Sequence, residues 1–394
     1  MLAVVAIVVV FSRDGWSWEW GRAISWATSS TLLLAPIAAG LAALDARKFG
    51  RGILGSIASS SVNGFWGVYL GTVIVWFGAV VAWLAGVVAA IVVTAQRADG
   101  FSLEPALAAT ALTTLLAAAS LGAVAGILWD HVVVAPLVAL AVYLLPLTLG
   151  QVIEVRDLFL AGGATGTLAG TAPNPVVTAT HLLVHGAISL MALLVIWVQC
   201  RPRSAARSSV VVGSVILVAV ALGAYLAAEP VKSARVNTPS ANVCEVSSSG
   251  AVEVCGAPET RALYSVAAES LDGAIQQLAE RGVVAASRYE EAGNGRVLDP
   301  EVGILAVDTV AVSAADIGVD DVVAALVAPR ACPFLYDEEP PAEHLDVQAT
   351  LAAWVYDVLG GVPTEPGDDR AASETMRWLA SCSPAGAPAW TYLP

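Results

Sequence analysis

Long apolar runs are the feature that most constrains this chain. A helix needs about 20 apolar residues to cross the hydrocarbon core of a bilayer. Six runs reach or approach that length, at residues 25–44, 66–94, 105–128, 132–151, 177–199 and 209–228. The 394 residues are 57% hydrophobic and 13% charged, whereas an ordinary soluble protein carries about a quarter charged residues. The pattern predicts a polytopic membrane protein.

A shorter apolar run opens the chain, at residues 1–11. It lacks the basic start and the small-residue cleavage site of a signal peptide. We interpret it as the end of a first membrane helix whose upstream part is absent, with an interfacial helix as the alternative. The expected fold is therefore an α-helical membrane protein of about seven helices, the first truncated, followed by a soluble α+β domain.

The charges divide the chain into two parts. Residues 1–228 hold 10 Lys and Arg against 8 Asp and Glu, whereas residues 229–394 hold 9 against 25. We therefore expect a transmembrane domain over 1–228 and an acidic domain over 229–394. An acidic surface does not suit nucleic acid or an anionic membrane surface, because both attract basic patches.

Basic residues in short loops predict the orientation. Cytoplasmic loops are enriched in Lys and Arg. Two tight clusters lie in alternate connections, Arg47, Lys48 and Arg51 in one and Arg201, Arg203 and Arg207 in the other. If both are cytoplasmic, the residues after 229 lie outside. We expect a multi-pass protein of the plasma membrane with an extracytoplasmic C-terminal domain.

Four of the five cysteines lie in the acidic part: Cys244, Cys255, Cys332 and Cys382. An even number in an extracytoplasmic domain indicates two disulfides. Of the three pairings, Cys244–Cys255 closes a short turn and Cys332–Cys382 ties down the end of the domain, so we favour these two. Four reduced cysteines are the alternative. The absence of CxxC and the single histidine of this part, His344, disfavour zinc.

Apolar spacing also predicts the elements of the acidic part. Helical periodicity and end signals mark residues 258–281, 320–327, 342–359 and 371–380, whereas the Val- and Ile-rich run 302–312 reads as a strand. About 150 residues are enough for a compact domain with its own core.

His181 and His185 are the polar pair of the membrane helices. Spaced four apart, they share one helix face. A haem or metal would need further ligands, and the neighbouring runs offer only Asp130 and His131, which the topology puts at the opposite surface. We expect the two histidines near the outer surface, facing the bundle interior or a cavity. Ionisable residues inside a membrane are functional candidates by default.

Enzyme motifs are weak or missing. Residues 50–55 match GxGxxG, but a membrane helix rather than a strand precedes them, so a cytoplasmic turn is the better interpretation. The chain contains no GxxxxGK[ST], and Glu343-His344 lacks the partners that hydrolysis requires. We therefore expect no enzyme activity, no resident cofactor and no metal.

Residues 1–200 resemble the permease subunit of type-two ABC exporters. The passage Leu41 to Arg51 is similar to the start of the cytoplasmic coupling segment in actinobacterial permeases of this kind. Leu121 to Pro136 resembles their tight turn between helices four and five, and residues 152–176 stand where short outer helices belong. Cys244 to Cys255, followed by Gly-Ala-Pro-Glu-Thr-Arg, is similar to the start of an uncharacterised extracytoplasmic domain that follows such permease segments.

The resemblance implies a function and partners. A separate ATP-binding cassette subunit would dock on Arg47, Lys48, Phe49, Arg51, Ile53 and Leu54, and ATP would act only through that subunit. A homodimer or heterodimer of permeases, surrounded by membrane lipid, would export a substrate that the sequence does not identify. The alternative is a membrane-anchored extracytoplasmic sensor or binding protein without transport activity.

Overall fold

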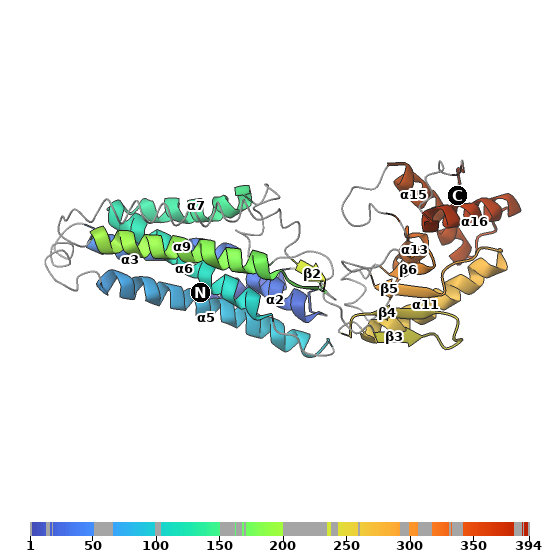
Figure 1. The fold of residues 1–394 in the computed structure, drawn as a ribbon, viewed down its shortest axis with the longest axis horizontal. Helices are drawn as coiled ribbons and strands as arrows, with labels where there is room; N and C mark the ends of the chain where they lie inside the picture. Colours follow the sequence, from blue (N-terminus) through green and yellow to red (C-terminus); the bar gives the residue numbers. More distant parts are fainter. Residues whose placement is uncertain are drawn as a thin grey trace.

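The computed structural model describes residues 2–12, 16–17, 19–50, 66–98, 104–149, 162, 168, 171–199, 235–237, 243–258, 261–291, 299–305, 317–330, 332, 342–381, 388 and 390–392. These residues form two parts (Figure 1). A bundle of apolar helices comes first in the chain, and a smaller domain with a mixed sheet, residues 243–392, lies beyond one end of the bundle. The second part is called the tail domain below.

Four helical segments of the bundle are long and apolar enough to cross a membrane. The first combines α2 (Trp20–Ser29), α3 (Thr31–Ala46) and η1 (Arg47–Phe49), and the others are α5 (Trp66–Thr94), α6 (Pro105–Leu128) and α9 (Pro175–Gln199). Two shorter apolar helices are α1 (Leu2–Phe11) and α7 (Val134–Leu149). The described part of the chain therefore contains four candidate membrane spans, which is compatible with the predicted helical membrane protein. The predicted run 209–228 lies outside the described residues.

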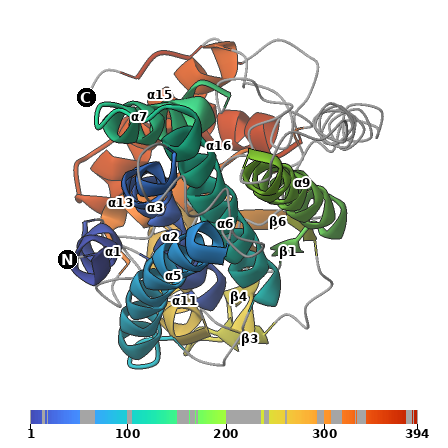
Figure 2. The same ribbon diagram turned by 90° about the vertical axis from the view of Figure 1, so that its left-hand side faces the viewer.

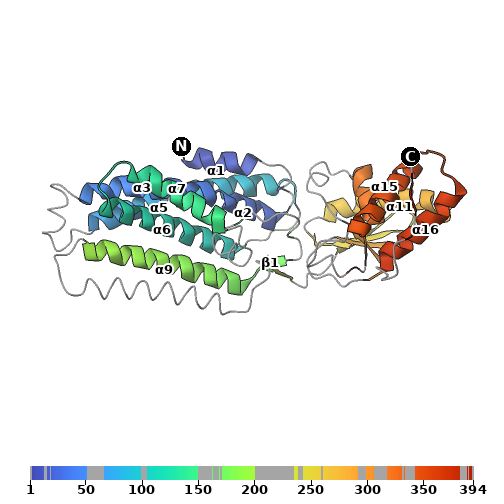
Figure 3. The same ribbon diagram turned by 90° about the horizontal axis from the view of Figure 1, so that it is seen from above.

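Helix α6 runs through the middle of the bundle. Figure 2, which looks along the bundle, shows α6 between α9 and the group of α3 and α5. Figure 3 shows α1 and α9 on opposite sides of the bundle, and α1 packs along α5. Every long helix of the bundle thus contacts α6, so α6 is the element around which the others are arranged.

Small residues let α3 and α6 approach each other closely. A Cβ atom at Gly122 would lie 2.0 Å from the carbonyl oxygen of Ala39, and one at Gly126 would lie 2.3 Å from that of Ala43. The two glycines and the two alanines each stand four residues apart, so both pairs lie on one helix face. This is the small-xxx-small arrangement by which membrane helices pack backbone to backbone.

The two ends of the bundle have different chemistry. At one end, a Cβ atom at Gly50 would lie 3.0 Å from the carbonyl of Ile127, so η1 sits beside the turn between α6 and α7. At the other end, β1 (Thr171–Pro173) pairs antiparallel with β2 (Arg235–Asn237). These are called the basic end and the tail end, because the first carries Arg47 and Lys48 and the second adjoins the tail domain (Figure 1).

The tail domain contains a four-stranded sheet in the order β3-β4-β5-β6. Strands β3 (Val243–Val246) and β4 (Glu253–Gly256) form an antiparallel hairpin, while β5 (Arg288–Glu291) and β6 (Val302–Leu305) continue the sheet in parallel. Helix α11 (Arg261–Glu280) makes the connection from β4 to β5, as a parallel pair requires. Helices α13 (Val319–Val327), α15 (Ala342–Leu359) and α16 (Pro366–Ser381) follow.

Large side chains fill the core of the tail domain. Trp354, Tyr264 and Tyr289 are fully buried, together with leucines of α11, α13 and α15. The predicted helices all occur, although α16 begins five residues before the predicted 371. The predicted strand 302–312 is described only as Val302–Leu305, and residues 306–312 lie outside the described part.

Candidate functional site

Helices of the bundle line a cavity of about 460 Å³ that is partly open at the surface of the bundle. Helices α2, α3, α6, α7 and α9 all contribute to its wall, which is mostly apolar, with residues such as Ala118, Leu121 and Ile188. Apolar clefts of roughly 300–1,000 Å³ with a few placed polar groups are the usual form of a small-molecule site. The size and lining of this cavity therefore fit a largely apolar ligand.

Two prolines interrupt the helices at the cavity wall. Pro36 lies inside α3 and Pro146 inside α7, and both line the cavity. A proline has no N–H, so the carbonyls four residues earlier, at Leu32 and Val142, lose their intrahelical donor. Both of these residues also line the cavity. The prolines thus place hydrogen-bond acceptors, and points where a helix can bend, beside the same space.

The predicted histidine pair lies at this site. His185 lines the cavity, and the rings of His181 and His185 stack with centroids 4.1 Å apart. Both histidines are buried. Thr114 of α6, which also lines the cavity, lies 2.9 Å through its Oγ1 from His181 Nε2, so the pair is connected across the α6–α9 interface.

The pair lies in the first half of α9. At about 1.5 Å per residue, His181 lies about 9 Å and His185 about 15 Å from the start of a helix about 37 Å long. His185 Nδ1 is 3.0 Å from the carbonyl of His181, and Ser189 donates to the carbonyl of His185 at 2.8 Å. The polar groups therefore continue along one face of α9 toward its middle.

The histidine pair does not have the geometry of a metal site among the described residues. Among the described residues, the group whose ligand atoms come close enough for an ion is Cys244, Glu253 and Cys255, not the histidine pair. Cys244 and Cys255 form a disulfide, which removes both thiolates that a metal would need. The described residues thus hold neither a third ligand for the histidines nor free thiols at the hairpin.

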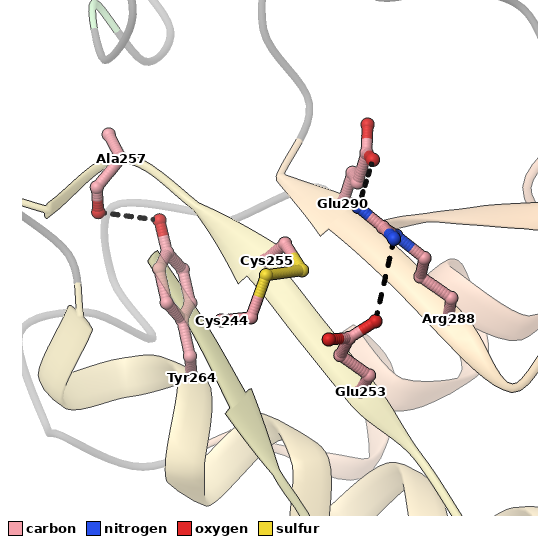
Figure 4. Close-up of a disulfide and its surroundings, with 7 residues drawn as sticks. All are labelled: Cys244, Glu253, Cys255, Ala257, Tyr264, Arg288 and Glu290. Atoms are coloured by element: carbon pink, nitrogen blue, oxygen red, sulfur yellow. Dashed lines mark hydrogen bonds and ion pairs between the residues drawn. A yellow bond between two sulfur atoms is a disulfide. The ribbon is translucent and has the colours of Figure 1, made fainter. Parts of the chain in front are cut away.

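The disulfide confirms one predicted pairing. Cys244 and Cys255 face each other directly across the β3–β4 hairpin, and Figure 4 shows the bond beside Glu253 and the Arg288–Glu290 pair. Cys332 is buried and also disulfide-bonded. Its predicted partner, Cys382, lies outside the described residues.

The predicted coupling segment is described in part. Lys48 is exposed and pairs with Asp45 at 2.7 Å. Phe49 turns inward, since a Cβ atom at Gly67 of α5 would lie 2.9 Å from its ring. Arg47 is half-buried, and Arg51, Ile53 and Leu54 lie outside the described residues. The basic end therefore presents Lys48, while Phe49 anchors η1 to the bundle.

The tail end holds a buried ion pair that sequence reasoning missed. Arg235 donates to both carboxylate oxygens of Glu104, through Nη1 at 3.1 Å and Nη2 at 2.5 Å. It also donates to the side chain and the carbonyl of Thr171, at 2.7 and 3.0 Å. The two charged side chains are only 11% and 9% exposed. No local sequence pattern predicts this ion pair, because Glu104 and Arg235 are 131 residues apart in the chain.

A second buried carboxylate lies nearby. Glu19 is 5% exposed and accepts a hydrogen bond from the backbone N–H of Leu168 at 2.6 Å. Gly162, at φ +76°, packs on α2, where a Cβ atom would lie 2.2 Å from the carbonyl of Ser25. Both contacts attach described residues of the predicted outer segment, 152–176, to the start of the α2–α3 helix.

The close helix contacts have a sequence signal, the GxxxG spacing at residues 67–71 and 122–126, which is typical of membrane helices that pack together.

The chain matches no protein-family model, and no curated protein or solved structure shows significant similarity to it.

Proposed function

We propose that this chain is the membrane-spanning permease component of an ABC exporter, driven by a separate ATP-binding subunit. The observation that carries the proposal is the cavity between the helices of the bundle, with Pro36, Pro146 and His185 at its wall. The cavity would hold the transported molecule, which its lining predicts to be largely apolar with a hydrogen-bonding group. The resemblance of residues 1–200 to such permeases supports the same function.

The packing of the helices supports motion between them. The α3–α6 contact is made by Ala and Gly backbones rather than by interlocking large side chains. Small sliding of packed helices is one of the standard ways in which proteins switch between two arrangements. Tilting of α3 and α7 about Pro36 and Pro146 would open the cavity toward one end or the other.

A further membrane crossing is part of the proposal. β2 pairs with β1, which immediately precedes α9, whereas Gln199 ends α9 about 37 Å away. Gln199 therefore lies at the basic end, and Arg235 lies at the tail end. The apolar run at 209–228 is long enough for a crossing between them. This crossing would place the tail domain and Lys48 on opposite sides of the membrane. We propose that the side of the tail domain is extracytoplasmic.

The proposal is tested by purifying the full chain from its native host in mild detergent. We expect an ATP-binding cassette protein to copurify, with an ATPase rate that depends on the permease. Charge reversal at the basic end, Arg47→Glu with Lys48→Glu, should remove that protein. Arg97→Glu, which changes a basic residue near the tail end, should retain it. If the unaltered chain brings down no ATP-binding protein, the ABC proposal fails.

The cavity has its own test. Ala118→Trp would fill space at the wall, where Ala118 is 4% exposed, and should lower the ATPase rate of the complex without removing the ATP-binding protein. Leu84→Trp alters α5 at a position 45% exposed on the outside of the bundle and should leave the rate unchanged. Equal rates in both variants would remove the cavity from the mechanism.

A sensor or binding protein without transport is the second candidate. The separate core of the tail domain favours it, because such a domain can bind a ligand by itself. Replacing the bundle by one unrelated membrane helix distinguishes the two. A sensor would keep its ligand binding, whereas an exporter would lose all function.

A further inference from the structure

Arg330 is a buried charge in the tail domain. It follows α13 and is only 7% exposed. Its backbone N–H donates to the carbonyl of Leu379 at 3.4 Å, and Nη1 donates to the carbonyl of Pro300 at 3.3 Å. Nη2 is buried without a hydrogen-bond partner, and none of the ion pairs in the described part of the chain includes Arg330. A guanidinium removed from water without a negative partner is strongly unfavourable.

Tyr289 supplies a second donor without a partner. This side chain of β5 is fully buried, and its hydroxyl makes no hydrogen bond to any described residue. The ring lies directly on Gly303 of β6, where a Cβ atom would be 2.3 Å from two ring carbons. Burial raises the pKa of Tyr289 to about 12, although the charge of Arg330 acts in the opposite direction. The hydroxyl therefore stays protonated and able to donate.

The sheet brings these two side chains to the same place. Tyr289 is the register partner of Gly303, and Pro300, which accepts from Arg330, lies three residues before Gly303. β6 stands at the edge of the described four-stranded sheet. The guanidinium and the phenol are near enough for each charge to affect the other group, yet they form no hydrogen bond. Two buried donor groups, Arg330 Nη2 and the Tyr289 hydroxyl, thus lie beside β6 without an acceptor among the described residues.

We propose that Arg330 and Tyr289 bind an oxyanion, a carboxylate or phosphate group of a small solute, at the β6 edge of the tail domain. A guanidinium matches such a group geometrically because its N–H donors point in parallel toward two oxygens. The Tyr289 hydroxyl would donate to the same anion. The bound charge would also compensate the buried cation. This site is separate from the membrane cavity and does not depend on the transport proposal.

The experiment uses the full chain in detergent micelles, with sodium acetate and sodium phosphate as probes and sodium chloride at equal ionic strength as the reference. We expect a saturating rise in the Tm of the tail domain with at least one probe. At a concentration about five times the Kd, linkage gives a rise of about 2–4 °C for a domain of this size. Hydrogen exchange should slow in peptides covering 288–291 and 302–305.

Three variants test the assignment to these residues. Arg330→Met should abolish the saturating rise, and Tyr289→Phe, which keeps the ring on Gly303, should weaken binding roughly two- to tenfold through the loss of one hydrogen bond. Arg370→Met changes an arginine whose side chain is 85% exposed and should bind as the unaltered chain does. If Arg330→Met does not fold, the change in anion affinity of Tyr289→Phe alone tests the assignment.

Two results would overturn the proposal. Phosphate stabilises many proteins without a site, so an equal rise in Arg330→Met and the unaltered chain would show a general salt effect. No saturating rise with either probe, together with a higher Tm in Arg330→Met, would show an unliganded buried charge. A response to acetate alone would identify a carboxylate ligand, and a response to phosphate alone a phosphate ligand.

Discussion

The bundle and the tail domain place their large side chains in opposite positions. In the bundle, the buried hydrophobic residues are mainly Ala, with a few tryptophans, while Leu70, Ile74 and Phe77 of α5 are about 60% exposed. In the tail domain, Trp354, Tyr264 and Tyr289 are buried. One chain thus follows two packing rules.

The difference reflects two solvents. Lipid tails are as apolar as leucine, so membrane helices gain little from hiding large side chains and associate by close backbone contact instead. In water, burial of large apolar side chains supplies the main driving force. The exposed stripe on α5 is therefore expected to face lipid.

The largest expected effect is at the joint between the two regions. Glu104→Gln leaves the buried Arg235 without its negative partner, and loss of one member of a buried pair costs about 3–5 kcal/mol. We expect residues 235–237 to detach from β1. The rate of protease cleavage between residues 230 and 243, measured on the full chain in detergent, tests this expectation.

An exposed pair serves as the control for the joint. Glu374→Gln removes the partner of Arg370, where the side chains are 85% and 50% exposed, and should cost only about 0.3–0.5 kcal/mol. Equal cleavage of Glu104→Gln and Glu374→Gln would mean that Arg235 does not hold the regions together.

Glycine substitutions in α6 test the packing rule of the bundle. Gly122→Ala places a Cβ atom 2.0 Å from the carbonyl of Ala39, so the helices must separate. Overpacking of this kind costs about 1–3 kcal/mol. Thermal unfolding in detergent should show a lower Tm for the helical signal, while the tail-domain transition stays unchanged.

Gly78→Ala and Gly186→Ala are the matched controls, because a Cβ atom at either position meets nothing within 4 Å. Glycine inside a helix is worse than alanine by about 0.5–1 kcal/mol, so these two variants should be neutral or slightly more stable. A fall in Tm for all of them would contradict backbone contact as the cause.

A smaller effect is expected at the cavity. Thr114→Val keeps the side-chain volume but removes the hydroxyl that contacts His181 Nε2. The loss of one hydrogen bond costs about 0.5–1.5 kcal/mol, measured as a fall in the Tm of the bundle. Thr148→Val, whose hydroxyl contacts only carbonyls of its own helix at an exposed position, should change the Tm less. The reverse order would show that the Thr114–His181 contact is not structural.

The smallest effect concerns pH and belongs to the tail domain alone. Hydrogen bonds, first from Ser249 and then from Gln276 and Ser247, lower the pKa of Asp272 despite its burial. A carboxyl with a lower pKa in the folded state stabilises the fold above its unfolded pKa of about 3.9, and this contribution is lost as pH falls through the folded value.

The Tm of the tail domain should therefore fall more steeply below about pH 4 in the unaltered chain than in Asp272→Asn. Ser249→Ala removes the largest cause of the shift and should give an intermediate slope. Identical slopes in all three proteins would exclude Asp272 as a source of the pH dependence.

Local sequence patterns predicted most elements correctly. The apolar runs at 66–94 and 105–128 coincide with α5 and α6, and the periodicity of 258–281 marks α11. The spacing of His181 and His185 likewise predicted two rings on one helix face. These predictions succeed because each depends on how one short segment meets its solvent.

The cavity and its partners could not be predicted in this way. Thr114 lies 67 residues from His181, and Pro36 and Pro146 stand on different helices. The GxxxG spacing marks Gly122 as a packing position, but it does not identify Ala39 as the residue that Gly122 meets. The packing of several helices together decides which helix faces meet. The sequence of one apolar run does not specify which other helix packs against it.

By itself, the sequence determined a membrane-embedded front, an acidic rear and a local disulfide, Cys244–Cys255, because hydropathy, charge and a short loop are properties of single segments. The tertiary structure alone decided the cavity, the Glu104–Arg235 joint and the proximity of the buried Arg330 and Tyr289 side chains. Each of these arises where distant segments meet, and the energy of a buried polar group depends on the partners that folding brings to it.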